Sequence, residues 1–271
     1  MLELKKKYLF KGKLKLKTAL HIGRGKINVT NTDSPVVRTP DGLPFIPGSS
    51  FKGSFRSAVE KIAISVPNIT SCQLIEESTT CPGVNQKSFT DRKDGMNEKK
   101  LIDALEKELC NTCKLFGSPY SASKIIFHDL MMVDWAGVTQ IRDGVVIDRD
   151  SERAIDKLKY DFEVVPPDSV FNMEIWLDNP STTELGLTCI GINEFVSGMG
   201  YVGGVKSRGL GHCEITNLQV YELDLETENE KFERLKKYLS GSTVEEKMTK
   251  TKGSQFISEQ IKIFIDTITP N

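Results

Sequence analysis

The segment DSPVVRTPDGLPFIPGSSFKGSFR, residues 33–56, decides how the chain folds and indicates what it handles. It starts as a loop rich in proline and glycine and passes at Pro47-Gly48 into a helix start. Ser49 or Ser50 can cap a helix from Phe51 to about Ser65, where apolar residues recur at helical spacing. The loop can present the carboxylate of Asp33, and the free amides of a helix start favour phosphate. The stretch therefore predicts a protein that binds, and can cut, a polyanion.

Composition places the chain among soluble globular proteins. Its 271 residues, 38% hydrophobic and 27% charged, suffice for one elaborated domain or two small ones. No apolar run approaches the roughly 18 residues that cross a bilayer. The basic N-terminus lacks the apolar core of a signal peptide. We expect a cytoplasmic protein with no membrane partner.

The charges are unevenly distributed along the chain. Residues 1–60 contain 12 Lys/Arg and 4 Asp/Glu, a net charge of +8, whereas the whole chain carries −1. Such segregation is typical of a surface that binds a polyanion, and a solvated lysine face is the alternative. Residues 8–20 alternate as in a half-buried strand, with lysines on one face and Phe10, Leu14 and Leu16 on the other.

The order of the expected elements indicates an α+β fold. Strands are expected at 8–20, 124–134, 169–177 and 212–223, and helices at 51–65 and, after a capping Ser181, 182–197. A cysteine-rich insertion (66–123), a projecting hairpin (137–165) and a tail with two helix-like stretches complete the chain. Without insertions the order is strand, helix, strand, strand, helix, strand. This is the ferredoxin-like plan, which RNA-recognition (RRM) domains also use.

A second glycine-rich stretch, residues 198–211, contains six glycines around a basic centre. Glycine lets backbone amides approach a ligand closely, and the cations can neutralise phosphates. The stretch follows a helix and leads into a strand, so it does not fit the dinucleotide fingerprint. A plain glycine-rich turn is the alternative. The candidate RNA contacts here are Gly203, Gly204, Lys206, Ser207, Arg208 and Gly209.

Lys52 and Arg56 are four residues apart and share one face of the expected helix. They lie in its first two turns, where the helix dipole already favours phosphate. Two solvated helix cations are the alternative interpretation. The exposed helix start at Pro47-Gly48 favours phosphate binding.

Asp33 is the candidate catalytic residue, because a loop carboxylate can bind a metal ion or orient a 2′-hydroxyl. A lone loop aspartate is more often an Asx-turn cap or solvated, and its spacing does not distinguish these roles. His21, His128 and His212 are isolated and are expected to be structural. Only His21 lies near the loop that carries Asp33.

Four cysteines have the spacing of a metal site. Cys110 and Cys113 form a CxxC pair, and Cys72 and Cys81 can complete a tetrahedral thiolate zinc site, closed and structural. A redox CxxC and unpaired thiols are the alternatives. A thioredoxin-type motif needs a βαβ context that is missing, and a cytoplasmic chain disfavours disulfides. Cys189 and Cys213 fall in expected core elements.

Taken together, these motifs resemble the RAMP (repeat-associated mysterious protein) superfamily of CRISPR–Cas systems, and specifically the backbone subunits of type III effector complexes. The resemblance covers about residues 8–222. The pieces that carry it are His21-Ile22-Gly23-Arg24-Gly25, Asp33-Ser34-Pro35-Val36-Val37-Arg38, the segment 43–53, Cys110-x2-Cys113 with Leu115-Phe116-Gly117, Glu163-Val164-Val165-Pro166-Pro167, and the loop 203–211.

The resemblance implies a ferredoxin-like palm over residues 1–223. The palm carries a cysteine-rich insertion (66–123) and a thumb hairpin (137–165). From their own helix-like pattern, residues 224–271 are expected to form a C-terminal helical extension. Such subunits stack along a CRISPR RNA guide, and the thumb interrupts the guide–target duplex. The implied palm contacts are Ser49, Ser50, Lys52, Arg56 and the loop 203–211.

By the same resemblance, Asp33 matches a loop aspartate that cuts bound target RNA once per subunit with a divalent metal such as Mg²⁺. Implied partners are the guide, single-stranded target RNA, copies or paralogues of the chain, a large polymerase-like subunit and small subunits. The four-thiolate set departs from relatives that often include a histidine ligand, and the tail after Leu223 lies outside the resemblance. Two alternatives are a non-catalytic guide-binding subunit and a guide-processing ribonuclease, which usually has a histidine-centred site.

Overall fold

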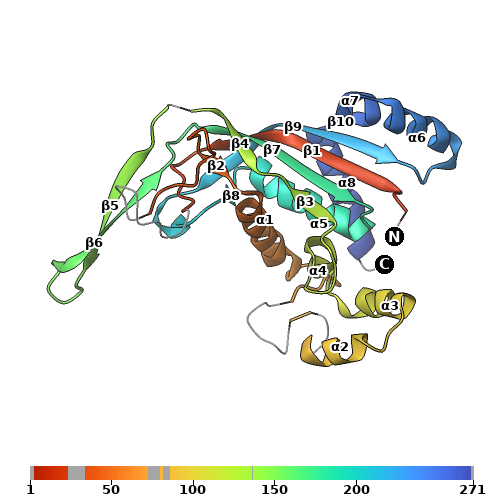
Figure 1. The fold of residues 1–271 in the computed structure, drawn as a ribbon, viewed down its shortest axis with the longest axis horizontal. Coiled ribbons are helices and arrows are strands. Elements are labelled where there is room, and N and C mark those ends of the chain that lie inside the picture. The colour runs from red at the N-terminus through yellow and green to blue at the C-terminus, as the bar shows by residue number, and fades with distance from the viewer. Residues whose placement is uncertain (1–2, 24–33, 73–79, 82–85, 136, 270–271) are drawn as a thin grey trace.

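A computed structural model describes residues 3–23, 34–72, 80–81, 86–135 and 137–269. The predicted catalytic Asp33 lies outside these residues. The fold is α+β with a large antiparallel sheet, as the element order predicts (Figure 1). None of the helices in the described ranges combines the length and apolar character that a bilayer-spanning segment needs.

The central strand of the sheet is β1 (Lys6–Leu16). It pairs antiparallel with β7 (Val170–Asp178) on one side and β9 (His212–Asp224) on the other. The sheet order is β10-β9-β1-β7-β4-β2, and β3 and β8 pair with β7 and β9. The remaining strands are β2 (Phe45–Ile46), β3 (Ile125–Phe127), β4 (Leu130–Asp134), β8 (Gly200–Tyr201) and β10 (Thr249–Lys252).

Three helices cover one face of the sheet: α1 (Gly48–Ala63), α5 (Thr182–Val196) and α8 (Gly253–Ile268) (Figure 1). Alternate residues of β1, including Phe10, Leu14 and Leu16, enter the core beneath them. The ring of Phe195 on α5 stacks on that of Phe55 on α1, with centroids 5.9 Å apart. Ser181 caps α5 in a capping box with Glu184, which confirms the predicted start of this helix.

The opposite face is partly covered by α6 (Lys231–Ser240) and α7 (Val244–Lys247), which follow a 3₁₀ turn, η2 (Glu228–Glu230). A second apolar cluster lies beneath them and includes Leu9 and Tyr221 of the sheet and Met248. Leu235 and Tyr238 of α6 pack against this cluster. The extension therefore begins by covering sheet surface that the palm alone would expose.

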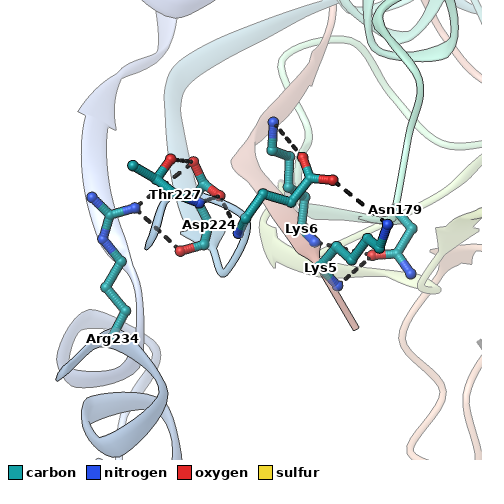
Figure 2. Close-up of polar contacts among 7 residues, drawn as sticks. Lys5, Lys6, Asn179, Asp224, Thr227 and Arg234 are labelled. Atoms are coloured by element: carbon teal, nitrogen blue, oxygen red, sulfur yellow. Dashed lines mark hydrogen bonds and ion pairs between the residues drawn. The ribbon is translucent and has the colours of Figure 1, made fainter. Parts of the chain in front are cut away.

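Polar contacts fix the point where this extension leaves the sheet (Figure 2). The side-chain oxygen of Asn179, just after β7, accepts from the backbone amides of Lys5 and Lys6 at 2.8 and 3.0 Å. The carboxylate of Asp224 accepts from the Thr227 hydroxyl at 2.8 Å, and Arg234 of α6 donates to the Asp224 carbonyl at 3.1 Å. The bonds of Asn179 join the start of β1 to the end of β7. The bond from Arg234 joins the end of β9 to helix α6.

Two segments project from this body. The predicted hairpin is present as β5 (Gln140–Ile147) and β6 (Ala154–Val164), a two-stranded sheet at one end of the molecule (Figure 1). The cysteine-rich insertion contains three helices and lies below α1 in this view. These are α2 (Gln86–Lys93), α3 (Glu98–Glu108) and α4 (Asn111–Phe116).

The last helix of the extension belongs to the main core. Phe264 of α8 is 1% exposed, and a Cβ at Gly186 of α5 would lie 2.5 Å from its ring. Because only glycine allows this approach, α8 packs directly on α5. Strand β10 also adds to the sheet beside β9. The tail beyond Leu223 is therefore built into the palm, although the sequence resemblance stops before it.

We predict that Phe264→Ala destabilises the whole protein by about 3–5 kcal/mol, as for other buried phenylalanines. The reason is the cavity left between α5 and α8. Chemical denaturation monitored by circular dichroism measures the loss. Ile263→Ala is the control, since Ile263 is 44% exposed on the same helix. Equal, small effects of the two changes would show that α8 does not support the fold.

Candidate nucleic-acid interface

Three loops meet at one end of the sheet because β1 is antiparallel to both neighbours. Strand β1 ends at Leu16 and leads toward the loop that contains Asp33. At this end Lys15 pairs with Val170, which follows the hairpin, and Leu16 pairs with Cys213, which follows the glycine-rich loop. The topology thus brings the predicted catalytic loop, the thumb base and the glycine-rich loop together.

The glycine-rich loop packs against His21. The amide of Gly204 donates to the His21 carbonyl at 3.0 Å, and a Cβ at Gly203 would lie 2.4 Å from that oxygen. Val205 has φ +58°, a conformation that costs a β-branched residue on the order of 1–3 kcal/mol. It precedes a 3₁₀ turn, η1 (Lys206–Arg208), whose three side chains are exposed. The loop is therefore a fixed, strained platform that presents Lys206, Ser207 and Arg208.

His21 and Glu163 hold the residue next to Asp33. The Nδ1 atom of His21 donates to the Glu163 carbonyl at 2.7 Å, and its Nε2 atom lies 3.3 Å from the Ser34 hydroxyl. The Glu163 amide donates to the Ser34 carbonyl at 3.0 Å. The Glu163 carboxylate also accepts from the guanidinium of Arg38 at 2.5 Å. Ser34, the first described residue after the loop that contains Asp33, is thereby fastened to strand β6, and His21 has the structural role that its isolation predicts.

Helix α1 has two polar faces that the sequence does not distinguish. At 100° per residue, Ser50, Ser54 and Lys61 share one face, whereas Lys52 and Arg56 lie on the opposite side. The Nζ atom of Lys206 is 3.4 Å from the Ser54 hydroxyl. A cavity of about 340 Å³ lies between this first face and the loop, lined in part by Ser54, Ser57, Lys61, Tyr201 and Lys206. Ser54, Ser57 and Lys61 repeat at helical spacing, a signal that could have indicated this face.

Lys52 and Arg56 instead face the cysteine-rich insertion. The Nζ atom of Lys52 donates to the Ser123 hydroxyl at 3.1 Å. Arg56 donates to the Glu60 carboxylate at 2.7 Å and lies 3.6 Å from the sulfur of Cys113. A separate cavity of about 460 Å³ borders Lys52, Arg56 and Cys113. The structure therefore does not bring this predicted pair of cations to the glycine-rich loop.

The helix start also differs from the prediction. Helix α1 begins at Gly48 after Pro47, and neither Ser49 nor Ser50 caps it. The Gly48 amide donates to the carboxylate of Asp129 at 2.7 Å, and the Ser50 amide donates to the Pro47 carbonyl at 2.9 Å. An aspartate distant in sequence therefore already satisfies the first amide of the helix. The side chain of Ser49 is exposed and that of Ser50 is half-buried.

The lysines of β1 and the residue after it do not form the basic surface that the charge count predicts. Cross-strand carboxylates neutralise four of them: Lys7 with Asp178, Lys11 with Glu174, Lys15 with Asp168, and Lys17 with Glu214, at 2.7–3.3 Å. These acids come from β7, β9 and the turn before β7, so this face is balanced in charge.

The cations beside α1 are different. Among the described residues, neither Lys52 nor Lys206 forms an ion pair with a carboxylate. Burial and neighbouring Arg56 lower the pKa of Lys52. Burial and neighbouring Lys61 lower the pKa of Lys206. An anion placed beside either lysine would relieve the effect on that lysine.

Aromatic side chains line the thumb base beside Arg208. The guanidinium of Arg208 donates to the Tyr160 hydroxyl at 2.5 Å. The ring of Tyr160 is stacked with that of Phe162 at 6.3 Å, and Phe162 meets the His21 ring edge-on at 5.4 Å. Our sequence reasoning missed these aromatics, although the alternation of Tyr160 and Phe162 within the expected hairpin was a usable signal.

The four predicted metal-ligating cysteines come together. The sulfur atoms of Cys72, Cys81, Cys110 and Cys113 all lie within 4.8 Å of one another. A tetrahedral zinc–thiolate site requires sulfurs about 3.8 Å apart, since each Zn–S bond is about 2.3 Å. A hydrogen bond from Cys113 lowers the pKa of Cys110 to about 4, whereas burial raises the pKa of Cys81 to about 12. The donor set is compatible with a zinc site, and Cys189 and Cys213 are buried in the core as predicted.

The model of the RAMP superfamily matches residues 13–214. The chain belongs to this superfamily. The match begins within β1 and ends near the start of β9, so it includes the converging loops and the cysteine cluster. The remainder of β9 and the extension lie beyond it.

Curated relatives carry one name, "CRISPR system Cms endoribonuclease Csm3". The protein from Methanocaldococcus jannaschii is 27% identical over 250 residues, which cover 81% of this chain and 82% of the relative. The one from Streptococcus thermophilus is 25% identical over 247 residues, covering 83% and 96%. A relative from Enterococcus italicus reaches 51% identity, but over only 53 residues, 18% of this chain.

Proposed function

We propose that this RAMP protein is a backbone subunit of a type III CRISPR effector complex that holds the guide RNA and cuts bound target RNA at Asp33. The family match and the endoribonucleases among its relatives support the proposal. The observation that carries it is the meeting of three loops beside cations that have no carboxylate partner within the described residues. A polyanion would supply the negative charge with which these cations can pair.

The RNA would cross the end of the sheet between α1 and the glycine-rich loop. Lys206 and Arg208 would neutralise phosphates, while Ser207 and the amides around Gly203, Gly204 and Gly209 donate hydrogen bonds. Tyr160 and Phe162 at the thumb base offer rings on which splayed bases can stack. Ser49, Ser50 and Lys52 remain predicted contacts. The strand order around β1 supports a ferredoxin-like palm.

Cleavage is assigned to the loop that ends at Ser34. A carboxylate at Asp33 is the kind of ligand that Mg²⁺ prefers, and a divalent ion supplies charge stabilisation at a scissile phosphate. The bonds from His21 and Glu163 to Ser34 would hold this carboxylate in place relative to the RNA. The partners would be the guide, single-stranded target RNA, copies or paralogues of the chain, a large polymerase-like subunit and small subunits.

We predict that Asp33→Ala in the assembled complex abolishes target cleavage and leaves guide and target binding intact. The change removes the proposed metal-binding carboxylate without altering the phosphate contacts. Gel analysis of labelled target RNA measures cleavage, and filter binding measures affinity. Asp41→Ala is the matched control, an exposed aspartate in the turn before α1. Unchanged cleavage by Asp33→Ala would favour a non-catalytic guide-binding subunit.

A guide-processing ribonuclease is a weaker candidate. Two of the three histidines are engaged in bonds that hold loops: His21 with Glu163 and Ser34, and His212 with the Gly198 carbonyl at 2.6 Å. His128 lies 3.6 Å from the carboxylate of Glu174 on the sheet. These positions do not assemble a histidine-centred acid–base site.

The unpaired cations should dominate the salt dependence of RNA binding. Lys206→Ala and Arg208→Ala should each lower the slope of log K against log[salt] by about 0.7–1, whatever the guide sequence, because each removes one phosphate contact. Titrations of the assembled subunit at several salt concentrations measure this slope. Lys11→Ala should not change it, because Glu174 already neutralises Lys11. Identical slopes in all variants would contradict phosphate binding by the loop.

We further propose that the cysteine cluster holds one structural Zn²⁺. Four thiolates leave no open position on the ion, so the site would stabilise the insertion and take no part in cleavage. Elemental analysis of the purified chain should find about one zinc per molecule, lost in the double variant Cys110→Ser/Cys113→Ser. Cys189→Ala, in the core, should retain the metal. Zinc-free wild-type protein, expressed with zinc present, would contradict the proposal.

A further inference from the structure

Arg56 lies between helix α1 and the cysteine cluster. Its guanidinium is 3.6 Å from the sulfur of Cys113 and 2.7 Å from the carboxylate of Glu60, one turn along the same helix. The ring of Phe116 stands beneath it, 5.7 Å from the guanidinium carbon to the ring centroid. The guanidinium therefore has an acceptor on one side, a sulfur on the other and an aromatic face below.

Two other sulfurs of the cluster accept from backbone amides. The Cys110 amide donates to the sulfur of Cys81 at 3.2 Å, and the Cys113 amide donates to that of Cys110 at 3.4 Å. Arg56 places a positive charge against a third sulfur, that of Cys113. Four thiolates around one Zn²⁺ carry a net charge of −2, and a partly buried charge of this size is costly unless it is compensated.

We propose that Arg56 is an outer-sphere partner of the metal centre that stabilises the Cys113 thiolate, and that it makes no phosphate contact. The inference rests on the proposed zinc site and goes beyond it, because it couples that site to helix α1. Glu60 orients the guanidinium, whose planar set of donors serves both neighbours at once. Through Arg56, the metal centre thereby holds one side of α1 in place. This side is opposite the face of α1 that contacts Lys206.

The chemistry distinguishes this role from RNA binding. Groups that support metal ligands typically change metal affinity by about 10–100-fold when removed. A phosphate contact instead changes the salt dependence of RNA binding and leaves metal affinity alone. The two roles can therefore be separated in one set of variants.

The test compares Arg56→Gln, Arg56→Lys and Lys206→Ala in the full chain. Zinc affinity is measured by competition with a chromophoric chelator, and the site is checked by the thiolate-to-metal absorption of the cobalt-substituted protein. RNA salt slopes are measured on zinc-loaded samples. We expect Arg56→Gln to weaken zinc binding about 10-fold or more with an unchanged slope. Lys206→Ala should leave zinc binding unchanged and lower the salt slope of RNA binding.

Arg56→Lys keeps the charge but loses the planar fork, so we expect an intermediate loss of zinc affinity. This variant also decides the question if Arg56→Gln does not fold. Wild-type zinc affinity in both Arg56 variants, or a slope lowered by about one counterion with zinc affinity intact, would overturn the proposal. Absence of zinc from the wild-type chain would instead refute the metal centre itself, so the two failures differ.

Discussion

The antiparallel pairing of β1 with β7 and β9 is the constraint on which the rest of the structure depends. It places the end of β1 beside the beginnings of both neighbours. Segments that precede or follow these ends must therefore meet, however far apart they are in sequence. The described segments that flank the predicted catalytic loop, the base of the β5–β6 hairpin and the glycine-rich loop owe their proximity to this one arrangement. Close contacts such as that between Gly203 and the His21 carbonyl then fix their spacing.

The pairing of lysines with carboxylates distinguishes the surfaces of this protein more clearly than the number of lysines on each surface does. The outer face of the sheet is rich in lysine, but neighbouring segments supply acids that pair with four of these lysines. The side of the molecule between α1 and the glycine-rich loop has fewer cations, and those in the described residues lack carboxylate partners. A polyanion would gain little from the first surface and more from the second. The lack of ion pairs among the residues described on this second surface therefore favours it as the site of the proposed RNA contacts.

Local features of the fold were predictable from sequence, and long-range ones were not. The cap at Ser181 predicted α5 to within one residue, because capping depends on neighbours in the chain. The alternation around Phe10 predicted β1 for the same reason, but the expected strand began two residues late and ended four residues late. The four cysteines were correctly grouped from the chemistry of thiolate metal sites, although the two pairs are far apart in the sequence. The carboxylates that pair with Lys11 and Lys15 come from distant segments, and so does the Asp129 carboxylate that binds the Gly48 amide. Nothing in the local sequence indicates these partners. The spacing of Lys52 and Arg56 showed that they share a face, but not which surface that face meets.

Strand β10 changes how copies of this chain can associate. It covers the free side of β9 and becomes the outermost strand, only four residues long and alternating threonine with lysine. Short outer strands that carry lysine resist continuation of a sheet into another molecule. This edge of the sheet is therefore poorly suited to pairing with a strand of a second molecule. A neighbouring molecule on this side would make contact through side chains rather than through backbone hydrogen bonds.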